Sequence, residues 1–255
     1  MEKYLQFYIY IPLLGYVLSL LINKKREAII ANIALGTSFI QLVFLISFSF
    51  LWYTSGAATL DIKQVTLLTT PEFDFFIDFL FDRISLVFLL VGSMLTLLVS
   101  VFSKYYIHRE PGFKRYFNNV QLFFLGYSIV VVAGNFETLF LGWEMIGITS
   151  FLLISFYRNR YLPVKNAMKV VSLYRLGDVF LILSMWLSHH LWHGNISFYD
   201  PHGNQFTKPY SDDTAKMIDE EVSKLVESQY QRALKILTEN KDKNLKQTNL
   251  DGLFL

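Results

Sequence analysis

Residues 139–156 read LFLGWEMIGITSFLLISF, and the rest of the chain is interpreted from this stretch. It is apolar enough to cross a membrane, yet it carries one carboxylate, Glu144, near its start. An ionisable group inside a membrane costs roughly 2.5–3.5 kcal/mol on insertion scales, so a functional role is expected of it. Gly142 and Gly147 flank Glu144, and small residues allow a second helix to approach closely. We therefore expect a membrane helix with a buried, functional acid.

The composition indicates a membrane protein. The chain has 255 residues, of which 53% are hydrophobic, and it contains 24 Phe and 15 Tyr. Several long uncharged apolar runs exclude an ordinary soluble domain. The sequence contains no cysteine, which excludes disulfides, iron–sulfur clusters and thiolate zinc sites on this chain. A formal net charge of only +2 gives no reason to expect nucleic-acid binding. No cofactor is predicted.

Hydropathy predicts an all-α, polytopic membrane protein with about six transmembrane helices, each of about 20 mostly apolar residues. The candidate helices span residues 4–22, 28–53, 84–107, 120–134 (starting near 117 as an alternative), 139–157 and 165–192. Between the second and third, residues 59–70 are rich in β-branched side chains and precede Pro71, which favours a β-hairpin on the outer surface.

The charges predict how the helices are oriented. Short loops rich in Lys and Arg stay on the cytoplasmic or matrix side. Ten such residues fall in alternate loops after the first, third and fifth helices: Lys24, Lys25, Arg26, Lys104, Arg109, Lys114, Arg115, Arg158, Arg160 and Lys165. Most of the charged side chains in the intervening segments are acidic. The N-terminus and everything after the sixth helix should therefore face outward.

The composition changes at His193, which predicts a membrane part over residues 1–192 and a polar tail over 193–255. Residues 195–210 are typical of a loop, and residues 211–243 have the apolar spacing of an outward-facing soluble amphipathic helix. A docking helix on a neighbouring protein is its simplest interpretation.

Four motifs resemble the antiporter-like subunits of respiratory complex I, above all chain 5 of NADH–ubiquinone oxidoreductase. Residues 140–157, FLGWEMIGITSFLLISFY, resemble the fifth helix of that family, with Gly142, Trp143 and Glu144 as its GWE motif. The other three are YRLGDVF at 174–180, DRISL at 82–86 and YIHREPGFKRYF at 106–117. The resemblance covers roughly residues 1–192 and implies proton translocation within a complex that oxidises NADH and reduces quinone.

The resemblance also implies that the protein is a fragment. Full-length members have more than twice as many helices, and the later ones supply the lysine partner of the glutamate. This chain stops after the sixth, so it resembles the N-terminal part of a split chain-5 subunit. A separate chain carrying the missing helices, other complex I membrane subunits and the lipid bilayer are its expected partners. The expected location is the mitochondrial inner membrane, with the tail in the intermembrane space, or else the bacterial inner membrane.

The tail has a second resemblance. Residues 210–243 are similar to the C-terminal helical segment of the peptidase domain in membrane-bound AAA metalloproteases of the FtsH kind. The zinc motif HExxH and the nucleotide loop GxxxxGK[ST] are both absent from the sequence, which excludes protease or ATPase activity on this chain. The segment is either an extension acquired when a gene was split or a chance similarity of one amphipathic helix.

Four residues are the candidates for proton translocation: Glu144, Lys169, Arg175 and Asp178. Burial disfavours an ionised carboxylate and a nearby cation favours it, so Glu144 can change protonation when its partner moves. The alternative for Glu144 is a structural hydrogen bond to a neighbouring helix. Arg175 and Asp178, spaced i,i+3, either tune its field or form a local ion pair. Lys169 either gates proton access or extends to the membrane surface.

Two further groups of residues are interpreted as structural. His189, His190 and His193 end the sixth helix, but adjacent histidines on a helix point apart, so no metal site is predicted. Trp52, Trp186 and Trp192 lie near helix ends and are interpreted as anchors at the membrane interface.

Three functions remain open from the sequence. The first is the complex I subunit. The second is a subunit of an Mrp-type sodium/proton antiporter, which shares the helical core, and the third is a non-catalytic membrane scaffold.

Overall fold

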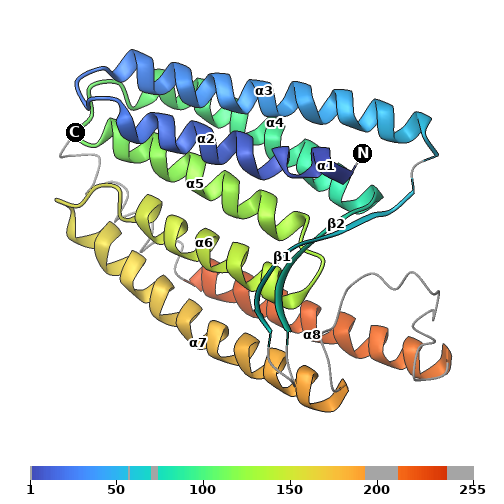
Figure 1. Cartoon of the computed structure of the whole chain (residues 1–255). Coiled ribbons are helices and arrows are strands. Elements are labelled where there is room, and N and C mark those ends of the chain that lie inside the picture. The colour runs from blue at the N-terminus through green and yellow to red at the C-terminus, as the bar shows by residue number, and fades with distance from the viewer. Residues whose placement is uncertain (1, 57, 70–73, 193–211, 240–255) are drawn as a thin grey trace. The chain divides into compact units, whose positions relative to one another are not determined.

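The computed structural model describes residues 2–56, 58–69, 74–192 and 212–239 (Figure 1). The predicted loop at 195–210, Pro71 and His193 lie outside the described residues. The chain divides into two compact units, Met1–Tyr199 and Asp200–Leu255. The predicted boundary between residues 192 and 193 stays a prediction, because residues 193–211 are not described.

The first unit is built mainly of helices. They are α1 (Glu2–Leu5), α2 (Phe7–Leu21), α3 (Glu27–Thr54), α4 (Arg83–Tyr106), α5 (Phe113–Val131), α6 (Phe136–Ile154) and α7 (Tyr161–Trp192). All six predicted apolar segments are therefore helical. Among the described residues, four helical segments are long and apolar enough to cross a membrane: α3, α4, α6 and Tyr161–Ser188 of α7. Helix α2 is apolar but shorter, so the count of about six spans stays a prediction.

Helix α5 begins at Phe113, before the predicted start at residue 120 and four residues before the alternative start near 117. Its first turns contain Lys114, Arg115 and two asparagines, which lower the local hydropathy and hide the helix from an apolar count. The helix forms there because it is amphipathic: Phe113 and Phe117 are buried while the basic side chains lie at the rim.

A β-hairpin follows α3, as the sequence predicts. Strands β1 (Leu60–Thr69) and β2 (Asp74–Phe81) pair antiparallel. The backbone of β2 also bonds the turn between α5 and α6: Leu80 N–H donates to Val132 O at 2.8 Å, and Gly134 N–H donates to Asp78 O at 2.9 Å. The hairpin therefore adds one small sheet to a mostly helical unit and holds the start of α6.

The hydrophobic core beside the hairpin is aromatic. Phe81 stacks on Tyr8 with ring centroids 5.8 Å apart, and Trp52 packs edge-on against Phe81 at 5.3 Å. Trp52 is only 2% exposed and its indole N–H donates to Ala58 O at 2.7 Å. The prediction that Trp52 anchors the chain at a membrane interface is therefore wrong, because the hairpin folds over this helix end.

The three basic loops meet at one end of the first unit, as the charge pattern predicts (Figure 1). Lys114 Nζ at the start of α5 donates to Ile22 O, just after α2, at 2.6 Å. Arg115 Nη2 donates to Phe156 O, just after α6, at 2.8 Å. The side of a membrane on which this end lies stays a prediction.

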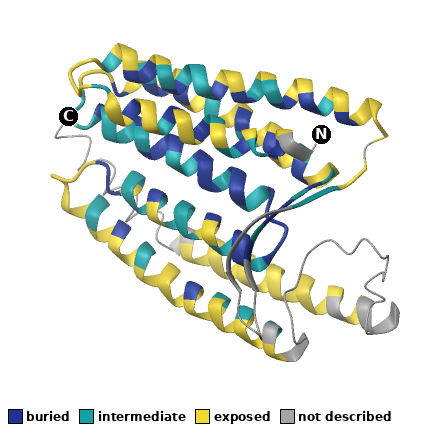
Figure 2. Ribbon diagram, in the orientation of Figure 1, coloured by how far each residue is buried: buried dark blue, intermediate teal, exposed yellow. Residues whose placement is uncertain are grey.

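The second unit contains α8 (Asp212–Glu239). The predicted tail helix over residues 211–243 thus forms over most of its length, and residues 240–243 lie outside the described part. Every side chain of α8 that the structure describes is exposed, including Val222, Leu225 and Ile236 (Figure 2). The helix therefore presents apolar side chains that are not buried within its own unit.

Candidate functional site

The start of α6 is fixed by a capping network. The Asn135 Oδ1 accepts from Thr138 N–H at 2.9 Å, and its Nδ2 donates to Phe76 O of β2 at 2.9 Å. Thr138 Oγ1 in turn accepts from Asp78 N–H at 3.0 Å. An N-cap of this kind satisfies backbone donors that the first turn leaves open. The network sets the position of α6, and Glu144 lies roughly 13 Å further along its axis.

Gly142 fixes the contact between α6 and α5. A Cβ added to Gly142 would lie 2.8 Å from Val130 N and 2.9 Å from Gly126 O, so the two backbones meet where only glycine fits. The predicted close approach beside Glu144 is therefore confirmed for Gly142. A Cβ on Gly147 would meet nothing within 4 Å, so in the described part no other helix approaches it.

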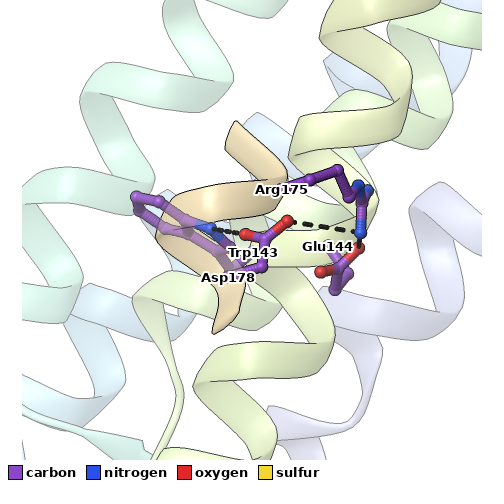
Figure 3. Close-up of polar contacts among 4 residues, drawn as sticks. All are labelled: Trp143, Glu144, Arg175 and Asp178. Carbon is purple, nitrogen blue, oxygen red and sulfur yellow. Dashed lines mark hydrogen bonds and ion pairs between the residues drawn. The ribbon is translucent and has the colours of Figure 1, made fainter. Parts of the chain in front are cut away.

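The fifth and sixth candidate helices bring the predicted charges together (Figure 3). Arg175 Nη1 of α7 lies 2.6 Å from Glu144 Oε2 of α6 and 3.2 Å from Asp178 Oδ2 on its own helix. Trp143 of α6 donates from Nε1 to Asp178 Oδ1 at 3.0 Å. Trp143, Glu144, Arg175 and Asp178 therefore form one connected group, here called the α6–α7 ion cluster.

The α6–α7 ion cluster is graded in exposure and unbalanced in charge. The Asp178 side chain is 8% exposed, Glu144 is 21% exposed and Arg175 is 47% exposed. Arginine stays protonated in proteins, so one guanidinium is shared by two carboxylates and the formal charge of the cluster is −1 when both are ionised. The expectation that Glu144 depends on another polypeptide for a cation is wrong in part, because Arg175 already pairs with it.

Lys169 is not part of the α6–α7 ion cluster. It precedes Asp178 by nine residues on α7, which at about 100° per residue puts it on the opposite face of the helix. Its side chain is exposed and lines a shallow cavity of about 530 Å³ with Lys165, Met168, Ser172 and Leu173. Sequence spacing alone made it a candidate, and the structure separates it from Glu144.

Of the three histidines at the end of α7, the structure describes the side chain of His190. His190 stacks on Trp186, with centroids 5.6 Å apart and an interplanar angle of 9°. The described residues contain no cluster of three or more His, Cys, Asp or Glu side chains that could hold a metal. His193 and the side chain of His189 lie outside the described part.

Sequence reasoning missed three polar residues near this site. Trp143 was noted only as part of a motif, and its donor role appears only when α7 packs on α6. Asp78 and Glu137 belong to the acidic segments that the charge pattern places in outer loops, but the structure buries them to 2% and 3% exposure at the start of α6. The predicted β-hairpin before α4 is the one sequence feature that could have indicated burial of Asp78.

The α6–α7 ion cluster has the elements of a proton-binding site. Two carboxylates accept protons, the guanidinium between them holds a fixed positive charge, and an indole N–H orients the more buried carboxylate. In an apolar surrounding such a cluster is costly to assemble unless each charge has a partner.

Comparison with known families supports a respiratory membrane protein. Residues 67–117 match the family described as NADH-ubiquinone oxidoreductase (complex I), chain 5 N-terminus. Residues 133–204 match the transmembrane family described as NADH:quinone oxidoreductase/Mrp antiporter. Residues 189–250 match peptidase family M41, and this weaker match is confined to the tail and the end of α7.

Individual relatives agree with these families. The chain is 33% identical to NADH-quinone oxidoreductase subunit L of Buchnera aphidicola over 193 residues, which is 74% of this chain and 31% of that protein. It is 30% identical to the Escherichia coli subunit L over 185 residues, 70% of this chain and 29% of the relative. To Sus scrofa NADH-ubiquinone oxidoreductase chain 5 it is 34% identical over 124 residues, 48% of this chain and 20% of the relative.

The chain thus spans less than a third of the length of these relatives. Its fold is similar to a chain of the membrane-bound sulfane sulfur reductase, an archaeal respiratory membrane complex. That match has a TM-score of 0.60 and 18% identity, over 74% of this chain and 37% of the other. At this identity the likeness concerns the fold alone. The resemblance of the first 192 residues to the N-terminal part of chain 5 is confirmed by the sequence matches.

Proposed function

We propose that this chain, as the counterpart of the N-terminal region of chain 5, is a proton-translocating membrane subunit of respiratory complex I. The observation that carries the proposal is the α6–α7 ion cluster, in which Arg175 joins Glu144 and Asp178 across two helices. Oxidation of NADH and reduction of quinone belong to other subunits in this proposal, and no cofactor is assigned to this chain. The complex would lie in the mitochondrial inner membrane or the bacterial inner membrane.

The proposed chemistry is a reversible proton transfer at Glu144. When a proton binds a Glu144 carboxylate oxygen, the attraction to Arg175 falls and the guanidinium keeps Asp178 as its counter-ion. When a second cation approaches, the ionised form of Glu144 is favoured and the proton leaves. At 4 Å and an effective dielectric constant of 20, one such charge pair is worth about 4 kcal/mol, which is enough to drive release.

We assign the second cation to a separate polypeptide. The cluster carries one unmatched negative charge, and Arg175 is half-exposed on α7. Only 6% of the apolar window of Tyr161–Ser188 is buried within the chain. Exposed charges are costly against lipid, so a protein surface bearing a lysine is the expected cover. In this proposal it comes from a chain that carries helices corresponding to the later part of the chain-5 relatives. The tail would lie on the intermembrane-space side.

One experiment tests the function directly. Glu144→Gln keeps the shape of the side chain but removes its ability to ionise. In the native complex, reconstituted into vesicles, we expect at least a tenfold lower rate of proton uptake, with the complex still assembled. Glu221→Gln on α8 is the matched control, since Glu221 is exposed and pairs with Lys224 on its own helix at 2.8 Å. We expect it to pump at the normal rate.

The same measurements separate the two alternatives. The match to a family that includes Mrp antiporters keeps a sodium/proton antiporter as the second candidate. Copurification of NADH dehydrogenase activity with the chain supports complex I, and proton exchange without that activity supports the antiporter. Unchanged pumping by Glu144→Gln in an assembled complex would instead favour a scaffold.

A further inference from the structure

A second polar site lies at the basic end of the first unit, away from the α6–α7 ion cluster. A cavity of about 590 Å³ opens between the loop after α2 and the loop that joins α4 to α5. Its charged lining consists of Lys24, Arg109, Lys114, Arg115, Glu27 and Glu110, a formal net charge of +2 from four basic and two acidic side chains. This net charge favours an anion.

Two of the four basic side chains are already used by the fold. Lys114 Nζ donates to Leu20 O at 2.8 Å and to Ile22 O at 2.6 Å, and Arg115 donates to Phe156 O. The side chains of Lys24 and Arg109 make no hydrogen bond or ion pair within the described part of the chain. These two cations are therefore available to a ligand.

One of the two acidic side chains in the lining, Glu27, is already engaged by the loop that joins α4 to α5. Glu27 Oε2 lies 3.1 Å from His108 Nδ1 and accepts from the backbone N–H of Arg109 at 3.2 Å. This contact holds Arg109, whose φ of 67° is left-handed, at the rim of the cavity. The loop is thus held in a conformation that brings a free guanidinium to the site.

The floor of the cavity offers neutral donors. It is formed by the first turns of α5, where Gly112 provides no side-chain cap and no acidic residue complements the helix dipole. Open backbone N–H groups at a helix start are suited to anions. Independently, Asn119 lines the same cavity and is 7% exposed, and its Nδ2 has no hydrogen-bond partner among the residues that the structure describes. A buried amide donor without a partner indicates that an acceptor is missing from the site.

We propose that this cavity binds a phosphate group, and that the phosphate belongs to the headgroup of an anionic phospholipid. The site lies where α3 begins and α4 ends, which is the depth of lipid headgroups for helices that cross a membrane. The neighbouring end of α2 exposes Leu20 and Leu21 to the acyl region. Basic pockets between membrane helices on the positively charged side bind such headgroups.

The test measures binding to the full-length chain in a neutral detergent, with three probes: dihexanoyl phosphatidylglycerol, dihexanoyl phosphatidylcholine and inorganic phosphate. We expect saturable binding of phosphatidylglycerol and at least tenfold weaker binding of phosphatidylcholine. Binding of inorganic phosphate as tight as that of phosphatidylglycerol would overturn the lipid source, and binding of neither would overturn the site.

Paired double variants keep the test independent of net charge. Lys24→Gln with Arg109→Gln removes the two free cations, and we expect roughly tenfold or greater loss of affinity. Lys25→Gln with Arg26→Gln removes the same amount of charge from two residues that follow Lys24 in the loop after α2 and do not line the cavity. We expect the affinity of this variant to change less than twofold. Asn119→Ala, which leaves the charge unaltered, should weaken binding severalfold. Equal loss in both double variants would show non-specific attraction and overturn the proposal.

Discussion

At the scale of single residues, the connection between Trp143 and Asp178 sets the geometry of the α6–α7 ion cluster. The indole N–H holds one carboxylate oxygen of Asp178 at 3.0 Å, while the other oxygen lies 3.2 Å from Arg175. Without the indole, Asp178 can rotate and draw Arg175 away from Glu144. The acid that we propose to carry the proton therefore depends on a residue that carries none.

Replacement of Trp143 by Phe tests this dependence. A hydrogen bond to a charged group contributes about 1.5–3 kcal/mol, which corresponds to roughly a tenfold to 150-fold lower pumping rate, and we expect a loss in that range. Assembly of the complex should be normal, because Trp143 is half-exposed on α6. Proton uptake by vesicles containing the native complex is the measurement. Trp186→Phe on α7, where Trp186 is exposed and stacks on His190, serves as the control and should pump normally.

At the scale of elements, the crossing of α5 and α6 determines where Glu144 lies. Gly142 and Gly126 allow the two backbones to touch, and the hairpin fixes the start of α6 through Asn135. One face of α6 is therefore held against α5, and the neighbouring residues Trp143 and Glu144 are directed to α7 (Figure 3).

Gly142→Ala should break this crossing. The added methyl would lie 2.8 Å from a backbone nitrogen that cannot move aside, so we expect a loss of about 1–3 kcal/mol in unfolding free energy. Thermal unfolding of the isolated chain in detergent measures it. Gly36→Ala on α3 is the matched control: nothing lies within 4 Å of its added methyl, and helix propensity predicts a gain of up to about 1 kcal/mol. Equal melting of both variants would contradict the close crossing.

At the scale of the whole molecule, the sequence predicts the elements better than their contacts. Hydropathy predicts the apolar helices because it depends only on neighbouring residues. The alternating basic loops predict which loops share an end, because the charges of each loop simply add. Hydropathy does not detect the first turns of α5, because these turns are buried on one face only and carry polar side chains on the other. The pairing of Glu144 with Arg175 joins residues 31 positions apart, and helical spacing gives no information on which faces of two helices meet.

Two further residues, Lys169 and Trp52, allow the sequence pattern to be compared with the packed structure. Lys169 seemed close to Asp178 in sequence, but it lies on the opposite face of α7. Trp52 has the position of an interface anchor, yet the hairpin that follows it in the chain covers it. For Trp52 the packing decides the outcome, whereas for Lys169 the spacing of nine residues at about 100° each already predicts the opposite face of α7.

The most consequential expectation at this scale is that another polypeptide covers α7. Gly177 lies beside Asp178, is exposed, and would meet nothing within 4 Å if it carried a side chain. The sequence has no cysteine, so Gly177→Cys introduces a single thiol at this surface. In the native complex we expect a short thiol-to-amine cross-linker to join it to a polypeptide with several membrane helices and a lysine among them, identified by mass spectrometry.

Phe50→Cys is the control for this cross-link. Phe50 is 70% exposed on α3, a helix that does not pack substantially against α7 in the described part, so its thiol should not capture the same polypeptide. A lipid-soluble maleimide that labels Gly177→Cys fully in the native complex, with no cross-linked product, would show that α7 faces lipid. The ion cluster would then have to work with Arg175 as its one cation, and the proposal of a split subunit would fail while the Glu144→Gln test would still decide on proton translocation.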